Sequence, residues 1–266
     1  MSTIQKQTPW QIQKSVIFAI FIRELNARFG RFSLGFIWGF AEPIVYTMAH
    51  AVFRGRFTGS TIAGISPMLL FASGCLTFFV FRNPIYASIN AVETNQGLFN
   101  YQRVKPADTM LARGFLEVLI MLGTGVILFP GLYLMGYTFT WNSSVQLVGV
   151  LLCLCMLAAG ISFVCCVVGP LWQESKKVIP MIMRPLFFIS GIFFPANAVP
   201  VQFRGFITWN PVLHALELTR EAMFANYTSH EGSWSYLFAC SSASLFIGLV
   251  VYRYFRVTVI TSGYIQ

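Results

Sequence analysis

Long apolar runs separated by short polar segments dominate the pattern of hydrophobic and polar positions along the chain. A helical membrane crossing needs about 20 apolar residues, and six runs approach or exceed that length, at residues 34–53, 66–83, 111–135, 145–171, 178–197 and 236–255. The runs are continuous, whereas the strands of a barrel would alternate apolar and polar residues. The pattern therefore predicts an all-α integral membrane protein, with six transmembrane helices in one membrane domain over residues 32–266.

A different period marks residues 1–31, which are too polar to cross a membrane. Apolar residues recur there at helical spacing, at Ile12, Val16, Ile17, Ile20 and Phe21. Lys14, Arg23 and Glu24 lie off this stripe. The segment predicts a cytoplasmic tail and an amphipathic helix that lies in the interface plane. A disordered basic tail is the alternative.

Residues 198–230 hold apolar pieces that are each too short to cross, interrupted by proline and by charged residues. They predict a re-entrant helical hairpin on the outer side, before the last span. Glu217 and Arg220 are three residues apart on one short helix and are therefore expected to pair. We expect the pair to hold the hairpin closed around an outer mouth, and a surface salt bridge is the alternative. The expected outer gate is Asn210, Pro211, His214, Glu217 and Arg220.

Composition supports a membrane protein and charge orients it. The chain is 56% hydrophobic and 10% charged, with a mean hydropathy of +0.67, whereas an ordinary soluble domain is roughly 25% charged. The net charge of +9 comes from basic residues at the ends of apolar runs, which favours anchoring over nucleic-acid binding. With the N-terminus inside, 14 of the 18 Lys and Arg residues lie on the inner side. Both termini are therefore expected to be cytoplasmic.

Signals of catalysis are missing from the sequence. It contains neither GxxxxGK[ST] nor GxSxG, and His50, His214 and His230 are far apart. The six cysteines lie in apolar runs without metal-ligand spacing, which indicates small core residues. We therefore expect no catalytic residue, metal or cofactor in this chain. If it moves a substrate uphill, the energy must come from another subunit.

The segment ETNQGLFNYQRVKPADT, residues 93–109, is too long for a tight turn and mixes apolar, aromatic and basic residues. Exposed apolar groups with a charged rim are typical of a docking surface. A plain connecting loop is the alternative. The residues expected to couple this chain to a partner, within segment 93–106, are Asn95, Leu98, Phe99, Asn100, Tyr101, Val104 and Lys105.

Three stretches carry a resemblance to a known family. They are IRELNARFGRFSLGFIWGFAEP at 22–43, NQGLFNYQRVKPADTMLAR at 95–113 and WNPVLHALELTREAMF at 209–224. In order and spacing they resemble the first-span, coupling and last-span motifs of type-2 ABC exporter permeases. The third is most similar to the branch that exports capsular polysaccharide, although O-antigen, teichoic-acid and drug permeases share the architecture. A departure is the expected outer loop FRGRFTG, where Arg54 and Arg56 contradict the positive-inside rule.

This resemblance implies a homodimer in the bacterial inner membrane, with each subunit docking one ATP-binding subunit that holds ATP and Mg. The two permeases would enclose a path for a lipid-linked polysaccharide, delivered to a periplasmic adaptor and an outer-membrane exporter. Export of a drug or a small lipid is an alternative. An integral-membrane transferase is a further alternative, but it would need a cluster of acids or histidines at one membrane face.

Candidate conduit residues follow from the chemistry of such a substrate. Arg28 and Arg31 would attract its phosphate, or would only anchor the chain to anionic lipid. Aromatic faces suit the CH-rich faces of sugars. Glu42, an acid inside an apolar run, is expected to line the path, and a protonated contact with a neighbouring helix is the alternative. The full conduit set is Arg28, Arg31, Trp38, Glu42, Tyr46, Phe78, Phe81 and Tyr86.

Overall fold

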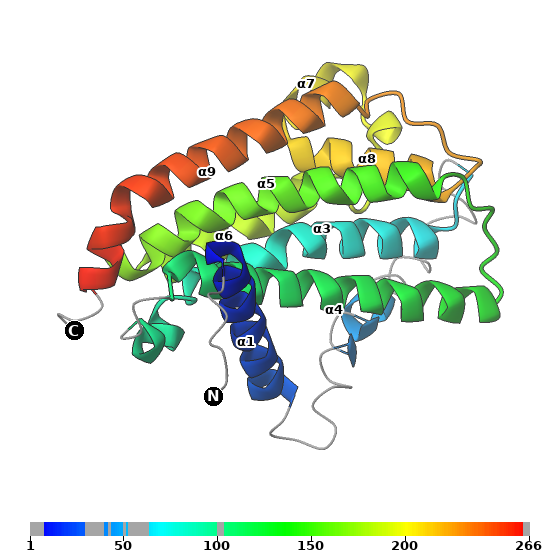
Figure 1. The fold of residues 1–266 in the computed structure, drawn as a ribbon. Coiled ribbons are helices and arrows are strands. Elements are labelled where there is room, and N and C mark those ends of the chain that lie inside the picture. The colour runs from blue at the N-terminus through cyan, green and yellow to red at the C-terminus, as the bar shows by residue number, and fades with distance from the viewer. Residues whose placement is uncertain are drawn as a thin grey trace.

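The computed structural model describes residues 8–29, 40–41, 44–49, 52, 64–99 and 104–262. Every regular element in these ranges is helical (Figure 1). In chain order they are α1 (Pro9–Phe29), α3 (Pro67–Ile89), the 3-10 helix η1 (Glu93–Leu98), α4 (Pro106–Leu134), α5 (Ser144–Leu171), α6 (Ser175–Ile189), the 3-10 helix η2 (Ala196–Ala198), α7 (Val201–Thr208), α8 (Pro211–Met223) and α9 (Trp234–Ser262).

Four of the described helices, α3, α4, α5 and α9, have the length and apolar composition needed to cross a membrane. They correspond to the second, third, fourth and sixth expected spans, so the expectation of an all-helical integral membrane protein is confirmed at this level. The first expected span, 34–53, lies mostly outside the described residues.

The fifth expected span, 178–197, differs from the structure. Helix α6 has 15 residues and ends at Ile189, which gives it a length of about 22 Å, less than the roughly 30 Å of a hydrocarbon core. Ser190 is its C-cap, and Gly191 follows with φ +76°. A left-handed residue at this position ends a helix, and glycine adopts it without a steric penalty. The apolar run continues past this stop, which is why it predicted a longer helix.

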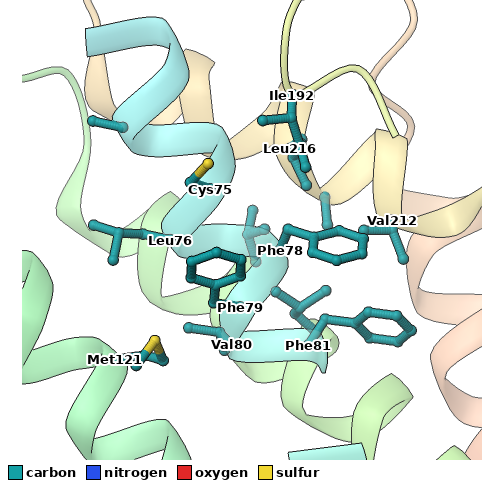
Figure 2. Close-up of a cluster of buried hydrophobic side chains, with 14 of the residues drawn as sticks. Cys75, Leu76, Phe78, Phe79, Val80, Phe81, Met121, Ile192, Val212 and Leu216 are labelled. Atoms are coloured by element: carbon teal, nitrogen blue, oxygen red, sulfur yellow. The ribbon is translucent and has the colours of Figure 1, made fainter. Parts of the chain in front are cut away.

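Helix α3 lies at the centre of the body. Nearly all of its side chains are buried, whereas most of α9 is exposed. Figure 2 shows the apolar cluster around α3, with Met121 of α4 on one side and Val212 and Leu216 of α8 on the other. Three of the six cysteines, Cys75, Cys165 and Cys166, are buried in apolar surroundings, as expected of core residues.

Helix α1 packs against α4 at a steep angle (Figure 1). The residues of its expected apolar stripe are buried or half-buried, with Ile20 at 5% exposure. Polar contacts accompany this packing: Gln13 donates a hydrogen bond to Asp108, and Arg28 forms an ion pair with Glu117. The segment expected to be helical therefore forms a helix, and it is fastened to the first half of α4.

Glycine allows α5 and α9 to pack closely. A β-carbon on Gly160 of α5 would lie 2.4 Å from the backbone oxygen of Ser244 on α9. Ser244 and Gly248 lie one helical turn apart on α9, so they form a small-xxx-small contact of the kind that lets membrane helices approach. This contact had not been predicted from the sequence.

The two ends of the helical body are built differently. At one end, η1 and the start of α4 meet the ends of α5 and α9 around a second apolar cluster that includes Val92, Met110, Val167 and Val259. At the other end, the connection before α5 bonds to the segment after α8, where Ala225 N–H donates to Thr140 O at 2.9 Å. The connections therefore alternate between two ends, as expected for consecutive crossings.

Candidate functional site

A pocket of about 520 Å³, named here the aromatic pocket, lies between α3 and α6. Three expected conduit residues, Tyr46, Phe78 and Tyr86, line it together. Its remaining described lining residues are Ala49, Arg82, Met183, Arg184, Phe187, Phe188 and Phe193. The structure thus brings together aromatic residues from the first expected span, from α3 and from α6.

Phe187 is the centre of the ring contacts in this pocket. Its centroid lies 5.2 Å from that of Phe78 at an interplanar angle of 83° and 6.3 Å from that of Tyr46. The Phe193 ring centroid lies 5.5 Å from that of Phe187, at an interplanar angle of 81°. Edge-to-face contacts of this kind fix the rings relative to one another. The wall is therefore a set of mutually supported aromatic faces and edges.

Two arginines line the same pocket. The Arg82 guanidinium lies 4.2 Å from the Phe79 ring centroid and 5.3 Å from that of Tyr86, and it donates two hydrogen bonds to Asn83 Oδ1, at 3.1 and 3.0 Å. Arg184 is exposed on α6. Neither belonged to the expected conduit set, because both had been interpreted only as inner-side charges. Their position inside apolar runs was the available signal, since ionisable residues there are usually functional.

Other expected conduit residues are placed elsewhere. Phe81 is 2% exposed and does not line the aromatic pocket, although its ring contacts that of Phe78 at 6.1 Å. It is a core residue, because this face of α3 is covered by neighbouring helices. Arg31, Trp38 and Glu42 lie outside the described residues.

Arg28 lines a second pocket of about 480 Å³, named here the polar pocket, between α1, α3 and α4. There it pairs with Glu117, while Arg113 Nε donates to Glu24 Oε2 at 2.9 Å. Tyr86 lines both pockets, so they adjoin. Arg28 is thus neutralised by a carboxylate of α4, which the sequence had not indicated because the two residues are 89 positions apart.

The expected coupling residues differ in exposure. Asn95 is 1% exposed and donates from Nδ2 to Ala91 O at 2.9 Å, so it supports η1 from inside. Leu98, Phe99 and Val104 are half-buried, and Lys105 is exposed as the N-cap of α4. Asn100 and Tyr101 lie outside the described residues.

An ion pair links η1 to α6. Lys176 Nζ lies 2.5 Å from Glu93 Oε2, and both side chains are about one-third exposed. Glu93 begins η1 and Lys176 lies in the first turn of α6. A displacement of η1 would therefore be transmitted directly to α6, which forms one wall of the aromatic pocket.

Glu217 and Arg220 form a buried ion pair, with Arg220 Nη1 at 3.2 Å from Glu217 Oε1 and side-chain exposures of 1% and 0%. The sequence had predicted the pair, but the alternative of a surface salt bridge does not hold. Arg220 Nη2 also donates to the backbone oxygens of Gly191 at 2.7 Å and Ile192 at 3.1 Å. The guanidinium therefore fastens α8 to the bend that follows α6.

The Glu217 carboxylate also accepts hydrogen bonds from three further residues. Its Oε1 accepts from Ala196 N at 3.0 Å, and its Oε2 accepts from Tyr227 Oη at 2.5 Å and Ser229 Oγ at 3.1 Å. Burial, with the Glu217 carboxylate beside it, raises the pKa of Tyr227 well above its usual range, so the hydroxyl stays protonated and donates. Together these bonds join the bend at 191–196, α8 and the segment before α9.

The other expected gate residues surround this ion pair. Asn210 is the N-cap of α8: its Oδ1 accepts from Val212 N at 3.0 Å and its Nδ2 donates to Ser190 Oγ at 2.9 Å. Pro211 follows at the first helical position, where a missing N–H costs nothing. His214 Nδ1 accepts from Ser233 N at 3.1 Å, so Nε2 carries the proton and donates to Thr208 O at 2.7 Å. All five residues stabilise one short buried helix and its neighbours.

Comparison with known proteins extends over almost the whole chain. Residues 15–224 match the family described as ABC-2 type transporter. The chain is 37% identical over 253 residues to the polysialic acid transport protein KpsM of Escherichia coli, covering 95% of this chain and 98% of that protein. It is 28% identical over 244 residues to the capsule polysaccharide export inner-membrane protein CtrC of Neisseria meningitidis, covering 90% and 91%. It is 20% identical over 239 residues to the O-antigen export system permease protein RfbA of Klebsiella pneumoniae, covering 87% and 88%.

Proposed function

The chain belongs to the ABC-2 type transporter family, and on this premise we propose that it is the membrane permease subunit of an ATP-driven exporter of capsular polysaccharide. The observation that carries the proposal is the 37% identity to a polysialic acid transport protein over 95% of the chain. The capsule-export relatives are named inner-membrane proteins. The four apolar helices support a multi-pass protein of the same membrane.

An ATP-binding partner is implied by the family. We place its docking surface on segment 93–106, where Leu98 and Phe99 are half-buried apolar residues and Lys105 is exposed. Closure of the partner on ATP would push η1, and the Glu93–Lys176 ion pair would pass the shift to α6. A homodimer, with a periplasmic adaptor and an outer-membrane exporter beyond it, completes the assembly.

The route of the substrate is assigned to the aromatic pocket. Sugars lie well on aromatic faces with few strong hydrogen bonds, which allows a chain to slide. The buried ion pair of Glu217 and Arg220 would keep the outer mouth in shape, with residues 198–230 forming the re-entrant hairpin. Both termini would then be cytoplasmic, with residues 1–31 as tail and interfacial helix and residues 32–266 as the transporter domain. The substrate would be linked to lipid, because the pocket has both apolar rings and charged arginines along its walls.

Deletion of the gene tests this function. Loss of surface capsule, with lipid-linked glycan accumulating inside the cell and restoration by the wild-type gene, is the expected result. Unchanged capsule with altered drug tolerance would overturn it in favour of small-molecule export. Loss of O-antigen instead of capsule would assign the chain to the function of its 20% identical relative. Co-purification with the ATP-binding subunit of the same system, and its loss in Leu98→Asp, tests the docking surface separately.

A further inference from the structure

The polar and aromatic pockets adjoin at Tyr86 but differ in charge. Three carboxylates, from Glu24, Glu93 and Glu117, and two guanidinium groups, from Arg28 and Arg113, line the polar pocket. The aromatic pocket has the guanidinium groups of Arg82 and Arg184 and no carboxylate among its described lining residues. Because each carboxylate of the polar pocket has a basic partner and the described lining of the aromatic pocket has no carboxylate to compensate its arginines, an anion is attracted more strongly to the aromatic pocket.

Arg184 is the exposed arginine of the aromatic pocket, whereas Arg82 is half-buried. Among the described residues no carboxylate lies within ion-pair distance of the Arg184 guanidinium, whereas Arg28, Arg113 and Arg204 each have one. It lies about 14 Å along the axis of α6 from Ser175, at about 1.5 Å per residue. A charged side chain within an apolar run of a membrane protein is costly unless it faces water or a ligand.

Arg82 approaches the pocket from the opposite wall, on α3. Its stacking over Phe79 and its two bonds to Asn83 orient the planar group. A guanidinium group recognises carboxylate or phosphate through paired N–H donors, which a lysine ammonium does not reproduce. Two such groups beside rings that suit sugar faces match a ligand that is both acidic and saccharide-like.

We infer that Arg82 and Arg184 form an anion-binding subsite in the aromatic pocket, which takes the oxyanion group of the exported molecule. The inference rests on the proposed function and adds that the substrate is acidic where it passes this point. The oxyanion is either a carboxylate on the sugar chain or a phosphate on its lipid anchor. Both have the same recognition chemistry, and the experiment separates them.

The test is equilibrium binding to the purified complex of permease and ATP-binding subunit, in neutral detergent. The probes are a fluorescent acidic oligosaccharide that carries carboxylates, a neutral oligosaccharide of equal length, and phosphatidylglycerol. The matched variants are Arg184→Gln, Arg184→Lys and Arg253→Gln, the last of which removes the same charge from an exposed position of α9. We expect the wild type to bind an acidic probe more tightly than the neutral one. We expect Arg184→Gln to lower the affinity for that acidic probe about tenfold.

Each probe and each variant distinguishes one outcome of the binding experiment. Loss of binding to the acidic oligosaccharide assigns the subsite to the sugar, and loss of binding to phosphatidylglycerol alone assigns it to the lipid phosphate. Arg184→Lys should recover only part of the affinity, and Arg253→Gln should bind as the wild type does. Equal binding of all three probes by the wild type, or equal effects of Arg184→Gln and Arg253→Gln, overturns the subsite.

The wild type alone keeps the inference testable if the Arg184 variants do not assemble. Binding of the acidic probe should weaken as salt rises, whereas binding of the neutral probe should not, because only the first involves a charge interaction. A salt-independent preference would contradict the subsite. The deletion strain separates the two proposals: if the strain loses its capsule but the purified complex shows no preference for acidic probes, the subsite is removed and the permease function stands.

Discussion

The backbone oxygen of Gly160 on α5 lies 2.2 Å from the position that a β-carbon on Gly248 of α9 would occupy. No flexible side chain separates the two helices there, so a methyl group can be accommodated only if the helices move apart. Overpacking of a tight contact costs about 1–3 kcal/mol. The first prediction is therefore that Gly248→Ala lowers the thermal midpoint of the detergent-solubilised protein.

Gly131 on α4 is the matched control, since a β-carbon there would meet nothing within 4 Å. Gly131→Ala replaces the same residue type in another apolar helix and should leave the midpoint unchanged or slightly raised, because alanine is the better helix former. Size-exclusion chromatography after heating measures both variants. Similar midpoints for the two would mean that α5 and α9 are not in close contact.

The second prediction concerns the buried pair of Glu217 and Arg220. Glu217→Gln keeps the shape of the side chain but leaves the Arg220 charge buried without its carboxylate, which costs about 3–5 kcal/mol. We expect a large loss of folded protein in the membrane. The half-buried Glu221, which has no ion pair in the described part of the chain, is the control, and Glu221→Gln should behave as the wild type.

A double replacement separates the loss of a contact from the presence of an unpaired charge. Glu217→Leu with Arg220→Met removes both charges together, and apolar replacement of a whole buried pair is often neutral. The double variant should therefore be more stable than Glu217→Gln, while it loses the bonds to the bend at 191–194. If the double variant unfolds more readily than Glu217→Gln, the backbone contacts of Arg220 outweigh its charge.

The third prediction addresses Arg28, which pairs with Glu117 across α1 and α4. Arg28→Glu places two carboxylates together and should detach α1 from α4, because like charges repel. Adding Glu117→Arg restores an ion pair in the opposite sense. Recovery of transport by the double variant would show that Arg28 anchors the helix, whereas continued loss despite restored folding would assign it to the substrate.

The fourth prediction tests the link between η1 and α6. Glu93→Lys should change stability by less than about 1 kcal/mol, because partly exposed ion pairs contribute little. It should nevertheless reduce the stimulation of ATP hydrolysis by substrate in the reconstituted complex. Glu93→Lys with Lys176→Glu should restore that stimulation. Full stimulation in the single variant would mean that coupling takes another route.

The helices were largely predictable because long apolar runs and N-terminal caps are local signals. Ser66 before Pro67, Ser143 and Asn210 each accept a bond from the first turn of their helix. The end of α6 was not predictable from hydropathy, because Gly191 stops the helix inside an apolar run. Glycine at a helix end was the signal available.

The candidate site was predictable only in part, for a physical reason. The pairing of Glu217 with Arg220 depends on a separation of three residues, which the sequence displays directly. Its burial depends on α3 and α5 covering α8, which no local pattern contains. Likewise, Arg82 and Arg184 meet at one pocket because α3 packs beside α6, although about one hundred positions separate them.

Arg220 holds the bend after α6 through the carbonyl oxygens of Gly191, Ile192 and Phe194. Every amino acid has a backbone carbonyl oxygen, so these hydrogen bonds do not depend on which side chains stand at Ile192 and Phe194. Substitutions of Ile192 or Phe194 would therefore leave these hydrogen bonds in place, as far as the surrounding space permits. Arg220 cannot be replaced without loss of these bonds, since no other side chain offers as many donors in one plane.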